Sequence, residues 1–201
     1  MKMLFKIVVG AVIATGLLLG STASAYEEGD WLVRVGVGNV DPKSSNGDVV
    51  SVDSGTALVF NGTYFFSPNV GLEILAATPF SHDIKAVDGG SKIGETKHLP
   101  PTFSLNYHFD TAGAFKPYVG GGLNYTLFFD EEIAGDSSLS LDGSFGLAAQ
   151  LGADIDISDT MFVNAAVRWI DINTDAKVDG SLVEEVEIDP IVFSLTLGWK
   201  F

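Results

Sequence analysis

The chain ends with IVFSLTLGWKF at residues 191–201, and this stretch is the clearest indication of the fold. Every odd-numbered residue in it is large and apolar, whereas the even-numbered residues are mostly small or polar. Because successive side chains of a β-strand point to opposite faces, one face of this strand is apolar. The strand continues to the last residue, Phe201, which has an aromatic partner at Trp199. A lipid-facing strand of an outer-membrane barrel needs such a stripe, and a soluble domain rarely leaves one at its terminus.

The first residues have the pattern of a secretory signal. Lys2 and Lys6 precede the apolar run of residues 7–19, and Ala23-Ser24-Ala25 forms an A-x-A cleavage site. We therefore predict a cleaved signal peptide over residues 1–25 and a single domain over residues 26–201. A retained membrane anchor is the weaker alternative, because the run is short for a span. The chain has no cysteine, so no disulfide supports an exported fold.

The charge balance is strongly acidic. The net charge is −15, and loss of the leader lysines leaves 9 basic and 26 acidic residues, a net charge of −17. This balance argues against nucleic acid as a partner, since phosphates require a basic surface. It is compatible with a membrane if the acidic residues lie in loops or inside a barrel. No segment after the leader resembles a transmembrane helix.

Seven further segments show the same alternation as the C-terminal one. Each sets large apolar side chains against small or polar ones, which is the pattern of a half-buried strand. The eight predicted strands are 31–40, 56–66, 70–78, 102–109, 118–129, 139–154, 162–172 and a last strand from about 186 to 201. The sequence thus predicts an all-β, eight-stranded antiparallel transmembrane outer-membrane β-barrel.

The predicted connections alternate in length. Residues 67–69, 110–114 and 157–160 form short turns. Residues 41–55, 81–97, 130–138 and 174–185 form long polar loops. Strand parity places all the short turns at one end and all the long loops at the other, as in barrels with short periplasmic turns and long extracellular loops.

A soluble β-sandwich or lipocalin-like barrel would alternate as well. Such a barrel keeps its apolar residues inside and its polar ones outside. Here the bulkier face carries aromatic residues near the strand ends, where interfacial girdles lie in membrane barrels. These residues are Trp31, Phe66, Phe109, Phe129, Trp169, Trp199 and Phe201. They favour the outer membrane of a Gram-negative bacterium.

Several motifs resemble those of the outer membrane protein W (OmpW) family, and they occur in order across the whole mature chain. They are GLEILAATPF at 71–80, HLPPT at 98–102, FKPYVGGGLNYT at 115–126, FFD at 128–130, WIDI at 169–172, and DP at 189–190 before the final strand. The resemblance implies an eight-stranded barrel with a narrow, partly hydrophobic lumen, which binds or passes small hydrophobic molecules and performs no covalent chemistry.

The resemblance also carries over to particular residues. Leu75 matches a leucine that points into the lumen. Where the family can place a large aromatic residue on the lumen face of the seventh strand, this chain has Arg168, with Trp169 beside it. Phe201 fits the C-terminal aromatic residue that the barrel-assembly machinery reads.

Strand parity gives an apolar set on the inner face. We predict that it lines the lumen and any ligand: Leu32, Val59, Phe65, Leu75, Tyr118, Phe128, Phe162 and Ile170. An eight-stranded barrel is just wide enough to be filled by side chains or to hold one small ligand. The set can therefore form either a pocket for an apolar solute or a plug.

Parity also puts ionisable residues inside, namely Arg34, Glu73, Asp142, Asp154 and Arg168. Charges in a narrow lumen are costly unless they are paired. We expect Arg34 and Arg168 to pair with carboxylates, Glu73 first among them. A structural network is favoured over a polar barrier to water and ions.

Other chemistries have weak support. The acidic residues at 130–132 and 184–187 lack calcium-loop spacing, and the three histidines lack metal-ligand spacing. The pair His82-Asp83 would need a nucleophile that the sequence does not identify. We therefore expect no catalytic residue, no metal and no cofactor.

The predicted function is a channel that binds or admits small hydrophobic molecules, with outer-membrane lipid and lipopolysaccharide as its surroundings. The alternative is a structural or receptor-like barrel whose extracellular loops bind external partners.

Overall fold

The computed structural model describes residues 25–201 except 44–49, 87–89 and 136. The predicted signal peptide, apart from Ala25, lies outside these residues. Within the described part of the chain, no helix is long and apolar enough to cross a membrane.

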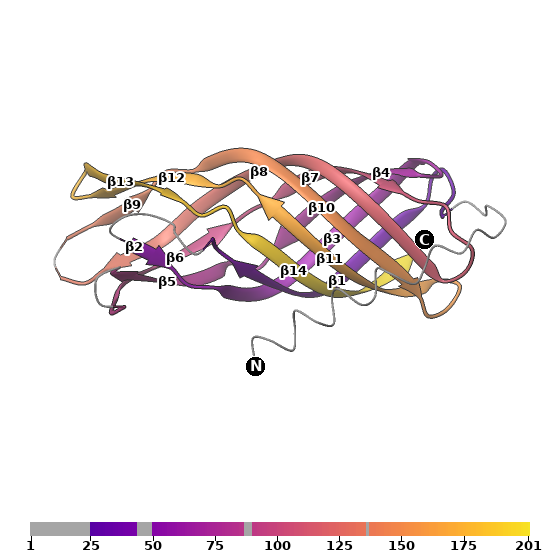
Figure 1. Ribbon diagram of the computed structural model, residues 1–201, viewed down its shortest axis with the longest axis horizontal. Coiled ribbons are helices and arrows are strands. Elements are labelled where there is room, and N and C mark those ends of the chain that lie inside the picture. The colour runs from indigo at the N-terminus through magenta and orange to yellow at the C-terminus, as the bar shows by residue number, and fades with distance from the viewer. Residues whose placement is uncertain (1–24, 44–49, 87–89, 136) are drawn as a thin grey trace.

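Eight strands close into a barrel in which every neighbouring pair is antiparallel (Figure 1). In order around the ring they are β1 (Trp31–Asp41), β3 (Gly55–Ser67), β4 (Val70–Ala77), β7 (Thr102–His108), β8 (Phe115–Ile133), β10 (Ser144–Asp156), β11 (Met161–Ile170) and β14 (Ile191–Lys200). The C-terminal strand β14 closes the ring against β1. The backbones of Trp31 and Phe201 bond to each other in both directions, at 3.0 and 2.9 Å. The predicted eight-stranded barrel is confirmed.

The outer wall of the ring is apolar. Its large apolar side chains are exposed over an area larger than soluble proteins leave in contact with water, as expected for a wall that faces lipid. Among them are Val33, Val37, Leu58, Phe60, Leu72, Ile74, Phe103, Leu105, Leu123, Leu147, Leu151 and Leu195. Aromatic residues gather at the end with the short turns, where Trp31 packs on Tyr64 with ring centroids 5.0 Å apart. We assign this end to the periplasm, as in other barrels with short turns on that side.

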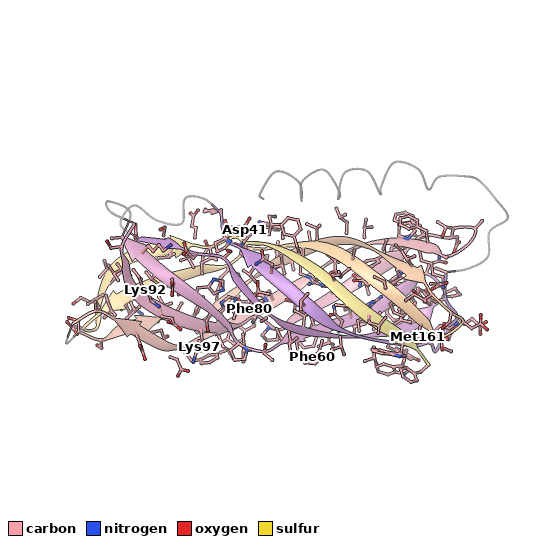
Figure 2. The ribbon with its side chains drawn as sticks, turned by 90° about the horizontal axis from the view of Figure 1, so that it is seen from below. Asp41, Phe60, Phe80, Lys92, Lys97 and Met161 are labelled. Carbon is pink, nitrogen blue, oxygen red and sulfur yellow. The ribbon has the colours of Figure 1, made fainter. Side chains whose placement is uncertain are left out.

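Within the described residues, six further strands build an extension on the opposite end of the barrel (Figure 1). From β8 the sheet continues through β6 (Lys92–Leu99), β5 (Phe80–Ala86) and β2 (Val50–Val52). A separate sheet holds β9 (Leu139–Leu141), β12 (Asn173–Val178) and β13 (Ser181–Glu187). Figure 2 shows Lys92 and Lys97 in this extension and Met161 at the other end. The outward positions of β5 and β6 carry charges such as Asp83, Glu95 and Lys97, so this hairpin stands outside the apolar band.

The extension corrects the loop predictions. Residues 81–97, 130–138 and 174–185 were expected to be loops, yet most of their described residues lie in strands. Their charged side chains point outward, and apolar ones such as Ile84 and Ala176 point inward. Strands with charged outward faces therefore resemble polar loops in their composition. Residues 44–49, 87–89 and 136 of the predicted loops lie outside the described part.

The predicted strand 139–154 is wrong in one respect. It is interrupted at Asp142 and Gly143, between β9 and β10. The inward positions change there from odd to even, because the chain passes from the extension sheet into the ring. Asp142, expected on the inner face, is consequently exposed and pairs with Lys177.

Candidate binding site in the lumen

A layer of buried charges crosses the lumen of the ring. Arg34 Nη2 lies 2.9 Å from Asp154 Oδ2, and Arg34 Nη1 lies 3.3 Å from Glu73 Oε2. Arg168 Nη2 lies 2.9 Å from Glu73 Oε1. All four side chains are buried, and their formal charges cancel. Glu73 is therefore the partner of both arginines, as expected, and Asp154 is a second carboxylate for Arg34.

Neutral polar groups complete this layer. Gln150 donates from Nε2 to Glu73 Oε1 at 3.0 Å and to Asn106 Oδ1 at 2.6 Å, and it accepts a bond from Arg168. Thr63 accepts from Arg34 at 2.8 Å, and Asn164 donates to Asp154 at 2.8 Å. Hydrogen bonds of this kind help to permit charges in a low-dielectric interior. Two buried atoms of the layer, Arg168 Nε and Asn106 Nδ2, have no hydrogen-bond partner among the described residues. Strand parity places these residues inside, but only the register brings them together.

Below the charged layer, an apolar cluster closes the periplasmic end. It contains Leu32, Phe65 and Phe162 from the predicted lumen set, joined by Ala25 and Tyr26. The Tyr26 ring lies 4.5 Å from that of Phe65, and its hydroxyl donates to Asp154 at 2.7 Å. Tyr118, another predicted residue, stacks on His108 at 4.7 Å. Tyr26 was missed because it precedes the first strand, where alternation gives no signal.

Above the charged layer, a second apolar cluster fills the lumen. It includes Leu75, Val59 and Ile170 from the predicted set, with Phe80 from β5 and Val192 from β14. Leu75 stands two residues beyond Glu73 on β4, so it lies directly over the charges. Arg168 is buried in the charged layer, whereas Trp169 points outward and is exposed. The part of the lumen around Leu75 is therefore plugged by side chains.

A cavity of about 160 Å³ opens above this plug, within the extension. Aliphatic side chains of seven strands form most of its wall, among them Ile84, Ile93, Leu141, Ala176 and Val186. Of the eight predicted lumen residues, only Phe128 borders it. Segments of the extension and the end of β8 provide most of the rest. Alternation does not identify these residues, because the charged faces of their segments predict loops.

Two histidines line the same cavity. His82 and His98 stack with ring centroids 4.8 Å apart, and Phe80 continues the stack at 5.4 Å from His98. Burial lowers the pKa of His82, and burial together with the neighbouring His82 ring lowers the pKa of His98 to about 3. Both imidazoles are therefore neutral at pH 7. Scattered in the sequence, the two residues meet because β5 and β6 form a hairpin.

One ring nitrogen of each cavity histidine has no partner among the residues that the structure describes. The Nε2 atoms of His82 and His98 have no hydrogen-bond partner, so neither histidine is paired with a nucleophile through that atom. Among the described residues, no three histidine, aspartate or glutamate side chains are placed to hold a metal ion.

Comparisons with known proteins agree with this architecture. A family model described as the OmpW family matches residues 27–201. Outer membrane protein W of Vibrio cholerae is 44% identical, with 95% of this chain and 96% of that protein covered. The crystal structure of OprG from Pseudomonas aeruginosa superposes with a TM-score of 0.81 at 35% identity, covering 89% of this chain and 98% of that one.

A more distant relative is named for a metabolic operon. The dibenzothiophene metabolism operon protein PahQ of Pseudomonas aeruginosa is 29% identical, with 87% of this chain and 90% of that protein covered. The closed barrel, its apolar outer wall and these relatives show that the chain belongs to the OmpW family and resides in the outer membrane of a Gram-negative bacterium.

Proposed function

We propose that this barrel binds small hydrophobic molecules in the cavity of its extension and admits them to the outer membrane. The observation that carries the proposal is the cavity of about 160 Å³ with its largely aliphatic wall. An apolar protein cavity of about 150 Å³ stays dry and binds benzene, so this one suits a molecule of about one ring. The relative PahQ is named for the metabolism of dibenzothiophene, which agrees with an apolar ligand, although this three-ring compound is larger than the cavity.

The charged layer makes a straight path to the periplasm unfavourable. An apolar solute there would separate the buried ion pairs of Arg34 and Glu73, and unpairing a buried charge costs about 3–5 kcal/mol. The solute therefore leaves the barrel above this layer.

Strand pairing offers a sideways exit at that height. The ladder between β4 and β7 ends with Leu75 opposite Thr102. Just beyond it stand Pro79 on one side and Pro100 and Pro101 on the other, which lack the backbone N–H needed to extend a ladder. We infer that a solute passes between these strands into the bilayer, beside Leu75.

Two variants test the proposal. Ala176→Phe fills the cavity, and Leu75→Arg places a charge in the plug beside the exit. We expect both to reduce uptake of radiolabelled p-xylene by whole cells toward the rate of cells that lack the barrel. Leu182→Phe is the matched control, since Leu182 is 61% exposed in β13. Uptake that is unchanged by both test variants, at equal amounts of folded protein, would overturn the proposal.

A second candidate function is adhesion or reception at the cell surface. The exposed apolar side chain of Leu182 on the β12–β13 hairpin favours it. Replacing residues 177–184 with a short turn should then abolish binding of cells to a host or bacterial surface. Unchanged surface binding in this variant would exclude this role for the hairpin.

A further inference from the structure

The sideways exit has two edges, which the strand pairing defines. The ladder between β4 and β7 ends at Leu75, and the ladder between β5 and β6 begins with Phe80 opposite His98. Residues 76–79 and 99–101, all of which the structure describes, form no strand pairing with one another between these two points. The exit is therefore a short interruption, with Leu75 at its periplasmic edge and Phe80 at its edge toward the cavity.

Phe80 stands between the cavity and this exit. Its ring lies 5.4 Å from that of His98, at an angle of 18°, and 6.4 Å from that of His82. Both histidines line the cavity. Phe80 also belongs to the buried cluster that contains Leu75, and its side chain is only 2% exposed. A solute that leaves the cavity for the exit consequently meets this ring.

The Phe80 ring extends across the lumen toward β1. A Cβ atom at Gly38 would lie 3.8 Å from Cζ of Phe80, so the end of the ring approaches the backbone of β1. Figure 2 shows Phe80 between Lys97 of the extension and Phe60 of the ring of strands along the long axis. The aromatic ring of Phe80 thus forms part of a floor that separates the cavity from the plug below it.

We propose that Phe80 is the gate between the cavity and the sideways exit, and that it sets the rate at which a bound solute reaches the bilayer. The inference rests on the proposed function, because it concerns release from the same cavity. The gate opens when the Phe80 side chain rotates about χ1 away from His98, a step that breaks no hydrogen bond between strands. Its cost is the loss of one stacked ring pair, and an apolar solute that enters the gap replaces part of the lost contact.

Two substitutions change the gate in opposite directions, since Phe80→Leu removes the flat ring and Phe80→Trp enlarges it. Uptake of radiolabelled p-xylene by whole cells is compared at equal amounts of folded protein. We expect Phe80→Leu to raise the uptake rate by about 2- to 10-fold, the factor that corresponds to one aromatic pair, and Phe80→Trp to lower it. The dissociation constant of p-xylene, measured by calorimetry with the full barrel in detergent micelles, should stay within about 2-fold of the wild-type value.

The matched control is Phe60→Leu. Phe60 is 41% exposed on the outer wall of β3, so the same substitution there should leave uptake at the wild-type rate. A purely structural role of Phe80 predicts the reverse of a gate for Phe80→Leu. The void left by a truncated core residue would loosen the cavity floor, and both p-xylene binding and uptake would fall.

The outcomes separate the gate from the proposed function. Faster uptake with Phe80→Leu and slower uptake with Phe80→Trp, at unchanged affinity, would establish the gate. If p-xylene binds and Ala176→Phe blocks its uptake, but Phe80→Leu gives no faster uptake than the wild type, the gate inference fails while the proposed function stands. If p-xylene does not bind and Ala176→Phe leaves uptake unchanged, the proposed function fails and the gate fails with it.

Discussion

Arg34 and Asp154 form a two-point ion pair across the lumen: Arg34 Nη2 and Nε lie 2.9 and 3.2 Å from the two carboxylate oxygens of Asp154. Both side chains are completely buried. Asp154→Asn would leave Arg34 with Glu73, a carboxylate that it shares with Arg168. We expect the free energy of unfolding in detergent to fall by about 3–5 kcal/mol, the cost of an uncompensated buried charge.

The control for this prediction is Asp156→Asn, two residues along the same strand. Asp156 pairs with Lys116 at 2.8 Å and its side chain is 30% exposed. The free energy of unfolding of both variants is measured by urea titration in detergent. Replacement of Asp156 should lower it by less than about 1 kcal/mol, because partly solvated pairs contribute little. Equal losses for the two variants would contradict the role of the buried pair.

The pairing of Glu73 with Arg168 predicts strong non-additivity. Glu73→Gln leaves the layer with one excess positive charge, and Arg168→Met leaves it with one excess negative charge. The double variant restores neutrality and keeps the pair of Arg34 with Asp154. We expect it to be destabilised by less than the sum of the single variants, by about 1–3 kcal/mol. Additive unfolding energies in the thermodynamic cycle would show that the charges do not act as one unit.

A glycine provides a steric test of the lower cluster. A Cβ atom at Gly198 would lie 2.2 Å from the ring of Phe162, which packs 5.3 Å from the guanidinium carbon of Arg34. Gly198→Ala must therefore displace this ring, and we expect a loss of about 1–3 kcal/mol in unfolding free energy. At Gly62 a Cβ atom would meet nothing within 4 Å, so Gly62→Ala should be tolerated. Heat-modified mobility in electrophoresis gives a second measure of both variants.

The neutral imidazole of His98 predicts loss of stability in acid. Its folded pKa of about 3 lies below the ordinary value of about 6.5, so only the unfolded chain takes up this proton as the pH falls through that interval. The contribution of neutral His98 to the free energy of unfolding is therefore fully present above pH 6.5 and declines toward pH 3. Between pH 6.5 and pH 5 the free energy of unfolding falls by about 2 kcal/mol on this account. His98→Phe should remove this part of the pH dependence, because the carboxylates titrate alike in both proteins. Parallel stability curves of the two proteins between pH 7 and pH 5 would rule it out.

Period-2 alternation predicted the ring well, because lipid imposes one apolar face on every spanning strand. It gave the inward positions of Arg34, Glu73 and Arg168. It could not give the contacts of Gln150 or Asn164, which depend on how strands are staggered. It also gave the wrong face for Asp142, because the inward positions change from odd to even between β9 and β10.

The cavity escaped sequence reasoning for a different reason. Its walls come from strands whose charged side chains point outward. In the sequence of a membrane protein, segments with so many charged residues resemble loops. His82 and His98 lie 16 positions apart, and nothing but hairpin register makes them neighbours. The lipocalin-like alternative is wrong for the ring. Its arrangement of apolar residues inside and polar residues outside does describe the extension.

The strand β8 passes through both regions without a break, and the chemistry of its two faces is exchanged along its length. Near Leu123 the outward face of β8 is apolar and its inward face is polar. Near Glu132 the outward face is charged, and Ile133 borders the cavity. A molecule that binds as proposed would consequently leave water inside the extension, which stands beyond the apolar outer wall of the ring. On the proposed function, the favourable removal of apolar surface from water would take place before the bilayer is reached.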